Sequence, residues 1–186
     1  MIKTKKLNIT FTSKDKTTPI GFKFLVDIVK NLEDIKENEF IFDLLSHSNI
    51  SAIREEIALK DNLSLQTIEY LLNDSNETTI NNLLHRQDTL NKLNTKQILK
   101  IIKSNNIKFI KIIAMTIEYL KKCDVEKIIK KLSKHDDPIV REALLYNIAV
   151  IPKKYLEILL NDEEIDIRKI VLERFNKIRH NSVLID

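Results

Sequence analysis

The chain has 186 residues and a formal net charge of +4 at pH 7, and with 43% hydrophobic residues it is long enough to bury one sizeable core. One Gly, three Pro, one Cys and no Trp exclude glycine-dependent nucleotide-binding loops, disulfides within the chain, and zinc or iron–sulfur sites built on its own cysteines. No run approaches the ~18 apolar residues of a membrane span, and we expect a cytoplasmic protein with neither a membrane segment nor a cofactor.

Residues 1–18 carry five lysines and one acidic residue and lack helical periodicity. The alternation of Leu7, Ile9 and Phe11 with polar residues would allow one short strand, but we expect a flexible basic tail because no partner strand is evident. From there on the apolar spacing is helical throughout, and Gly and Pro are too rare to interrupt it. We therefore expect a single helical domain over 19–186.

Internal repetition is the strongest pattern in this helical region. The chain aligns on five positions at intervals of 27, 30, 30 and 27 residues: Arg54, Asn81, Lys111, Arg141 and Arg168. The positions nine before, one before and three after each of these residues are apolar in all five copies. Each copy is too small to cover its own apolar face, so the copies are expected to pack on their neighbours.

Each repeat is predicted to be two helices joined by a turn rich in Asn, Asp and Ser, which are residues that cap helix N-termini. The spacing predicts first helices over 64–73, 95–103, 124–133 and 152–161. It predicts second helices over 50–60, 78–86, 107–121, 139–150 and 165–178. Two further helices, over 21–32 and 38–46, are expected before the first complete repeat.

The segment from Asp137 to Leu144, DPIVREAL, resembles the second-helix signature of HEAT repeats, Asp-Pro-x-Val-Arg-x-Ala. Ile53-Arg54 and Ile167-Arg168 are weaker copies, and the stretch from Ile53 to Ala58 also resembles the leucine-rich-repeat variant. The resemblance covers about residues 38–180. It implies an all-α, HEAT-like α-solenoid of about five stacked helical hairpins.

In such families an Arg and an acidic residue of successive units form a ladder that ties the repeats together. The resemblance therefore implies a structural ladder in which arginines pair with nearby turn acids, and its members would be Arg54, Arg141, Arg168, Asp137 and Glu164. Asn81 and Lys111 replace the Arg in the middle repeats, so the ladder is expected to be interrupted there.

No arrangement typical of an enzyme or a metal site is evident. The four histidines lack metal-ligand spacing, and the two lysines before Cys123 would favour a reactive thiolate only if the thiol were exposed. One HEAT-like family is enzymatic, the DNA glycosylases that remove alkylated bases, and its site relies on aromatic residues that include Trp, which this chain lacks. We expect a protein that is not an enzyme and that holds no metal.

One candidate binding surface lies on the second helices. Helical geometry directs four of their residues away from the packed side, onto what the resemblance implies is the concave surface: Ile112, Thr116, Tyr119 and Tyr146. Met115 flanks them and completes the candidate surface. An apolar and aromatic centre with a polar rim suits a protein or peptide partner. The same residues could instead pack against adjacent helices as core.

The other candidate surface is a lysine-rich block, residues 92–134, with twelve lysines and three acidic residues. Six of these lysines lie on first helices and could bind phosphate: Lys96, Lys100, Lys103, Lys127, Lys130 and Lys134. They could equally be a solvated helix surface, and no aromatic residues for base stacking lie among them.

From these two surfaces we expect a non-catalytic scaffold or adaptor that binds a protein partner. The alternatives are a nucleic-acid-binding repeat protein that uses the lysine-rich block, and an inhibitor or immunity protein that neutralises a toxin. Nothing in the sequence sets the oligomeric state.

Overall fold

The computed structural model describes the backbone of residues 19–182 and, within that range, the side chains of residues 23–147, 149–173 and 175. Every regular element in this part of the chain is helical, with twelve α-helices and three 3₁₀ helices, so the predicted all-α class is confirmed. The chain divides into two compact units, Met1–Ile80 (unit 1) and Asn81–Asp186 (unit 2). The predicted tail, residues 1–18, lies outside the described residues, and one repeat domain over 19–186 stays a prediction.

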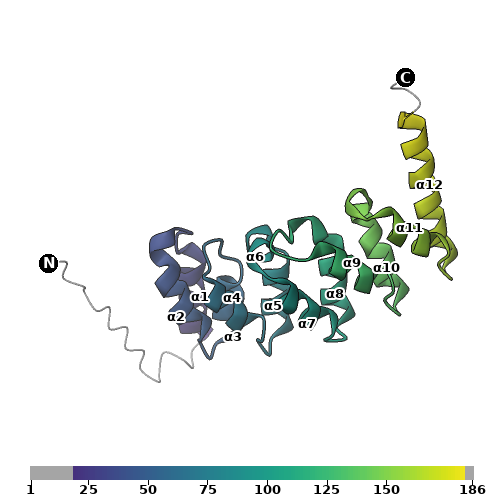
Figure 1. Cartoon of the computed structure of the whole chain (residues 1–186). Coiled ribbons are helices and arrows are strands. Elements are labelled where there is room, and N and C mark those ends of the chain that lie inside the picture. The colour runs from purple at the N-terminus through teal and green to yellow at the C-terminus, as the bar shows by residue number, and fades with distance from the viewer. Residues whose placement is uncertain (1–18, 183–186) are drawn as a thin grey trace. The chain divides into compact units, whose positions relative to one another are not determined.

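Unit 1 is built around helix α3. Its elements are α1 (Pro19–Asn31), the 3₁₀ helix η1 (Lys36–Asn38), α2 (Glu39–Ser46), α3 (Ser51–Ile57), α4 (Leu65–Leu71) and the start of α5 (Glu77–Leu84), which ends in unit 2. Helix α3 packs against α1 and α2, and α2 packs against α4 (Figure 1). The apolar side chains of Phe42, Ile57, Ile68 and Leu71 are fully buried between these helices and form the core of the unit.

Unit 2 continues from the end of α5. Its further elements are α6 (Gln87–Lys92), α7 (Thr95–Ile102), α8 (Ile107–Met115), η2 (Ile117–Tyr119), α9 (Val125–Leu132), α10 (Pro138–Leu144), η3 (Leu145–Val150), α11 (Lys153–Leu160) and α12 (Ile165–Ser182). Helix α8 packs against α7 and α10, helix α9 packs against the same two helices, and α11 packs against α12. Ile98, Ile113, Ile128, Leu144 and Leu159 are fully buried at these contacts.

Most predicted helix starts are confirmed, and the residues that fix them are polar caps. The side chain of Ser64 accepts a hydrogen bond from the N–H of Thr67 at the start of α4, and Asp124 accepts one from Lys127 at the start of α9. Asn94 and Gln97 form a complete capping box at the start of α7. These contacts satisfy N–H groups that have no partner within the helix.

Two predicted second helices are wrong in their second halves. The helix expected over 107–121 ends at Met115, and the helix expected over 139–150 ends at Leu144, each being followed by a 3₁₀ helix. Helix α6 was not predicted at all. The middle repeats therefore contain a third, short helical element that turns the chain back toward the next first helix.

Five turns between first and second helices share one hydrogen-bond pattern. In each turn one residue donates its N–H to the carbonyl three residues earlier, and its side chain accepts the N–H two residues later. The second helix begins three residues after it in every case. These equivalent turn residues are Ser48, Asp74, Ser104, His135 and Asp162. The turns, rather than the apolar columns, define the alignment of the repeats.

The turn-based alignment corrects the sequence alignment by one residue in the middle repeats. Counted from the helix start, the fourth residue of each second helix is Arg54, Ile80, Ile110, Arg141 or Arg168. Isoleucine, and not Asn81 or Lys111, therefore occupies the arginine position. The sequence alignment slipped because adjacent pairs such as Ile113 and Ala114 are both fully buried, so the apolar columns match in either register.

In unit 2 the first helices are joined near their N-termini. In unit 2, the N–H of Asp124 donates to Thr95 Oγ1 at 2.7 Å, which joins the start of α9 to the start of α7. The Glu126 carboxylate accepts hydrogen bonds from Lys154 and Tyr155, which joins α9 to α11 in the same way. Helices α7, α9 and α11 are thus held parallel and in register.

Candidate functional site

The predicted binding surface on the second helices is smaller than expected. Ile112 is only 6% exposed and packs in the core, and Thr116 is half-buried, with its hydroxyl donating to the Ile112 carbonyl at 2.7 Å. Met115 is 37% exposed, Tyr119 is half-buried and Tyr146 is 67% exposed. Ile112 is buried because the sequence alignment was one residue out in this repeat, whereas Thr116 is half-buried because α8 ends at Met115 and the helical projection does not hold beyond that residue. Met115, Tyr119 and Tyr146 remain, and we call them the tyrosine face.

A buried amide holds the tyrosine face together. The Asn147 side chain, 9% exposed, donates to the carbonyl of Ala114 at 3.0 Å and to the carbonyl of Met115 at 2.7 Å. Both carbonyls lie at the C-terminus of α8, where a helix has no N–H groups left to offer them. Contacts between η3 and both α8 and η2 bring Tyr146 and Tyr119 to the same place. The Asn147 side chain of η3 thereby supplies the hydrogen-bond donors that a further turn of α8 would have supplied.

In unit 1, a buried side chain binds the carbonyls at the end of a helix in a similar way. Lys60 lies twelve residues after its turn residue, as Asn147 does, and it is only 6% exposed. Its ammonium group donates to the carbonyls of Lys30 at 3.0 Å and Leu32 at 2.7 Å, at the C-terminal end of α1. A cation at this end also interacts favourably with the helix dipole.

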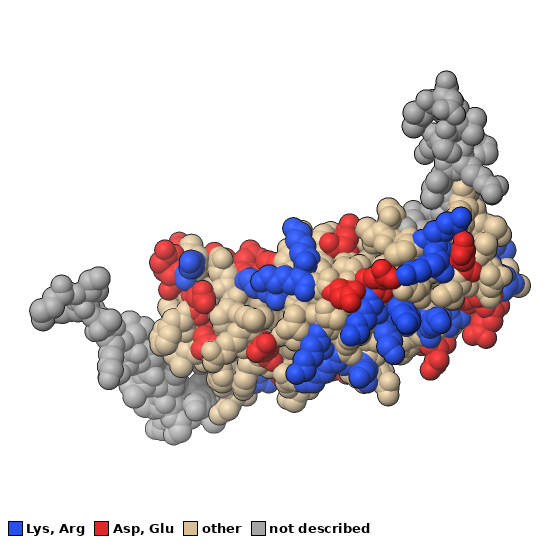
Figure 2. Space-filling view, viewed as in Figure 1, with Lys and Arg blue, Asp and Glu red and all other residues tan. Residues whose placement is uncertain are grey.

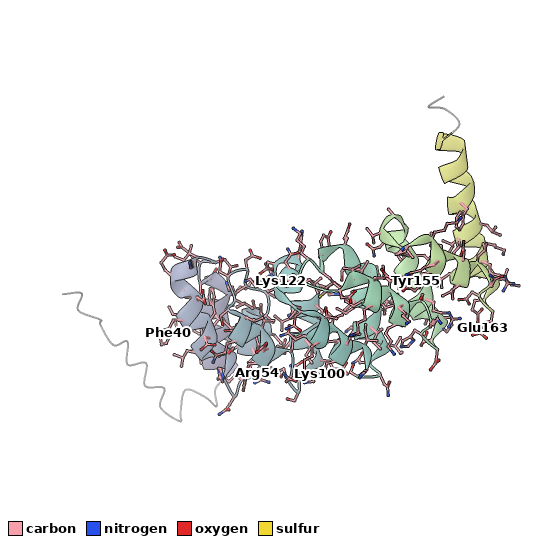
Figure 3. All side chains as sticks on the ribbon, in the orientation of Figure 1. Phe40, Arg54, Lys100, Lys122, Tyr155 and Glu163 are labelled. Atoms are coloured by element: carbon pink, nitrogen blue, oxygen red, sulfur yellow. The ribbon has the colours of Figure 1, made fainter. Side chains whose placement is uncertain are left out.

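Two buried ion pairs join consecutive hairpins, one in each unit. Arg54 binds both carboxylate oxygens of Asp74, with Nε–Oδ2 and Nη2–Oδ1 distances of 2.6 and 2.9 Å, and Arg54 is labelled in Figure 3. Arg141 binds Asp162 in the same bidentate way at 2.7 and 2.8 Å. The side chains of Arg141 and Asp162 are only 7% and 5% exposed. Each arginine also donates to backbone carbonyls of its own turn, which fixes the guanidinium between two hairpins.

The acidic partners therefore differ from the predicted ones. The Asp137 carboxylate accepts the N–H of Ile139 and caps α10, so it is used within its own helix. Glu164 donates its N–H to Asp162, and Arg168 donates to the carbonyls of Asp162 and Glu163. The carboxylates that pair with Arg54 and Arg141 come from the next turn along the chain, whereas the hydrogen bonds of Arg168 go to backbone carbonyls of the turn before its own helix.

Both ladder carboxyls have a lowered pKa. Hydrogen bonds from the Arg54 guanidinium hold the pKa of Asp74 below its ordinary value, against the opposing effect of burial. Burial acts to raise the pKa of Asp162, but hydrogen bonds from Arg141 and from the Glu164 N–H outweigh it and lower the pKa. A lowered folded-state pKa means that the ionised carboxylate stabilises the fold above about pH 4.

We expect acid to weaken the protein through these two groups. Their contribution should be complete above the unfolded-state pKa of about 3.9 and should be lost as the pH falls through the lowered folded-state values. Urea unfolding at a series of pH values measures this effect. Between neutral and acid pH, the free energy of unfolding should fall less for D74N/D162N than for the wild type. The control is D166N, because the Asp166 side chain is 87% exposed and its removal should leave the acid dependence unchanged.

The lysine-rich block has its exposed charges on two neighbouring helices of unit 2. Lys96 and Lys100 lie on α7 and Lys103 directly follows it, at intervals of four and three; Lys127 and Lys130 lie on α9 and Lys134 lies in the turn after it, at intervals of three and four. All six are exposed, and we call them the lysine face. Figure 2 shows Lys and Arg side chains gathered where α7 and α9 lie. The buried residues of the two helices, among them Ile98 and Ile128, lie on the opposite side.

Cys123 and the three histidines whose side chains the structure describes form no reactive cluster. Cys123 donates its thiol to the carbonyl of Leu93 at 3.4 Å, and burial raises its pKa, which disfavours the thiolate. His135 is the turn residue that accepts the Asp137 N–H. Among the residues that the structure describes, no group of three or more His, Cys, Asp and Glu side chains could hold a metal ion.

One exposed apolar surface was missed by the sequence analysis. On α1, Phe24 and Ile28 are 64% and 46% exposed, and on α2, Phe40 and Leu44 are 76% and 65% exposed. The signal in the sequence was two apolar pairs at i and i+4, one on each of these two helices.

Comparisons of the chain with protein families, with curated proteins and with solved structures gave no match. Within residues 19–182, no helix has both the length and the apolar content needed to cross a membrane.

Proposed function

We propose that this chain is a non-catalytic, HEAT-like scaffold or adaptor that binds a protein partner through its tyrosine face. The observation that carries the proposal is the exposure of Tyr146. Its side chain is 67% exposed, whereas the adjacent Leu145 and Asn147 are 2% and 9% exposed. The backbone on both sides is therefore fixed by burial while the aromatic ring is held in solvent.

An exposed tyrosine on a fixed backbone is suited to protein recognition. Binding orders few torsions in a Tyr side chain, which can bury a large apolar area and still use its hydroxyl as a hydrogen-bonding group. Tyr, Trp and Arg account for many of the residues that dominate interface energies, and Met is also enriched at interfaces. Met115 adds an adaptable apolar side chain next to Tyr146, because Asn147 ties the two backbone segments together.

The repeat architecture in this proposal is supported by the turns. Five turns with one hydrogen-bond pattern recur at intervals of 26, 30, 31 and 27 residues, each followed by a second helix. Parallel, aligned first helices in unit 2 agree with hairpins that repeat by translation.

A photo-crosslinking amino acid at position 146 tests the proposal in the full chain. We expect a discrete protein adduct from cells at this position and no such adduct from position 153, which is also exposed but lies on α11. Replacing Tyr146 and Met115 with Ala should then weaken the affinity of the identified partner by about 30-fold, as loss of ~2 kcal/mol at an interface centre would. Equal crosslinking at both positions, or an unchanged affinity, would contradict the proposal.

A further inference from the structure

The lysine face forms two parallel rows of positive charge. The hydrogen bond from the Asp124 N–H to Thr95 sets the start of α9 level with the start of α7, and the contact of Cys123 with the Leu93 carbonyl lies beside it. Packed helices lie about 8–10 Å apart, so the two rows have about that separation. The row from Lys96 to Lys103 spans about 10 Å, since seven residues of helix rise that far, and the row from Lys127 to Lys134 runs along α9 into the turn that follows it. Six ammonium groups are thereby held over a small area.

The two helices that carry these charges contain few acidic residues. Helix α7 contains no acidic residue, and the one carboxylate within α9, Glu126, accepts hydrogen bonds from Lys154 and Tyr155 of α11. Lysines at i, i+3 and i+4 repel one another along each row. An anionic partner would relieve this repulsion. The first helices of unit 1 differ, because α2 and α4 carry acids and no lysine.

The chemistry of the face favours a phosphate backbone over other anionic partners. The block over residues 92–134 contains lysines and no arginine, and Lys is depleted from protein interfaces, whereas a point charge suffices for phosphate. Aromatic residues that would stack on unpaired bases are absent from the exposed positions of α7 and α9. The apolar sides of both helices are buried in unit 2, so neither helix has an apolar face to insert into a bilayer.

We propose that the lysine face binds the phosphate backbone of double-stranded nucleic acid without sequence preference. Two rows about one interhelix distance apart, carried on long flexible side chains, can reach phosphates on both sides of a groove about 12 Å wide. The face has no arginine that could bind a phosphate through two hydrogen bonds and no aromatic side chain that could stack on a base. Its contacts are therefore ionic, and counterion release is the main source of affinity. This surface is separate from the tyrosine face and its assignment does not depend on the proposed protein partner.

Binding of the full chain to a mixed-sequence DNA duplex about two turns long, measured by fluorescence anisotropy across salt concentrations, tests the proposal. If six lysines contact phosphates, the affinity should fall by about 10³-fold between roughly 50 and 200 mM salt. The variant K103Q/K127Q/K130Q should bind on the order of tenfold more weakly at low salt, with a salt slope lower by about 2 to 3. Gln keeps the helix propensity of Lys and each site is exposed, so the fold should be retained.

The matched control is K36Q/K153Q/K169Q, which removes the same number of charges from exposed sites on other elements, η1, α11 and α12. It should keep most of the affinity and the wild-type salt slope. Equal weakening by both variants would overturn the proposal, because net charge alone would then explain binding. So would the absence of duplex binding at low salt, or tighter binding to single-stranded DNA, polyglutamate or phosphatidylserine vesicles than to the duplex.

Discussion

Replacing Arg141 with Ile should destabilise the protein by about 3–5 kcal/mol, because the substitution leaves the Asp162 carboxylate buried without its cation. Asp162 is only 5% exposed in its side chain, so water cannot replace the two hydrogen bonds that Arg141 donates. D162S should also be destabilising, by about 2–4 kcal/mol, since it leaves the guanidinium without its carboxylate.

The double variant R141I/D162S should recover most of this loss. The chain itself provides the precedent, because Ile110 occupies the arginine position of the preceding second helix and is fully buried, and the turn residue that follows it is His135. Serine is a competent turn residue, since Ser48 accepts the N–H of Ile50 in the same geometry. Both buried charges are absent from the double variant, and its turn can still be capped.

Urea unfolding of the four proteins gives the coupling energy between positions 141 and 162 directly. We expect a coupling of about 2 kcal/mol or more, and recovery of helicity by the double variant if R141I alone is unfolded. The control cycle uses Lys169 and Asp166, which are 65% and 87% exposed and should couple by less than about 0.5 kcal/mol. Additive losses of stability at positions 141 and 162 would contradict a direct interaction between Arg141 and Asp162.

The helices could be predicted from the sequence because their signals are local. Apolar spacing and polar capping residues such as Ser64 and Asp124 act within one turn of helix, and both the class and most helix starts followed from them. The recurrence of these signals also indicated repeats of nearly equal length.

Register within the repeats and the ends of the second helices could not be predicted in this way, because they depend on contacts between distant residues. The end of α8 is stabilised by Asn147, which lies more than thirty residues further along the chain. Helix α6 begins after Arg86, which is not a capping residue, so no local signal marks its start. Both limits affect the tyrosine face, since Ile112 was assigned to it in a register one residue out and Thr116 from a helix that ends before it.

Removing the amide of Asn147 should cost about 2–4 kcal/mol, because N147A leaves two carbonyls at the end of α8 without a donor and each is worth about 1–3 kcal/mol. The Ala114 carbonyl is buried together with the amide that serves it, so solvent cannot restore that bond. N147D should be worse than N147A, since its carboxylate would lie against the same carbonyl oxygens. Urea unfolding measures the loss, and hydrogen exchange should rise at residues 114–119.

The matched control is N161A in the same unit. The Asn161 side chain also donates to a helix carbonyl, that of Glu157, but the bond is exposed and water can replace it. Its loss should stay within about 0.5 kcal/mol. Two results would contradict this account: an equal loss of stability in N147A and N161A, or an N147D variant as stable as N147A. In either case α8 would end at Met115 for a reason other than the donor supplied by η3, and the tyrosine face would keep its geometry without Asn147.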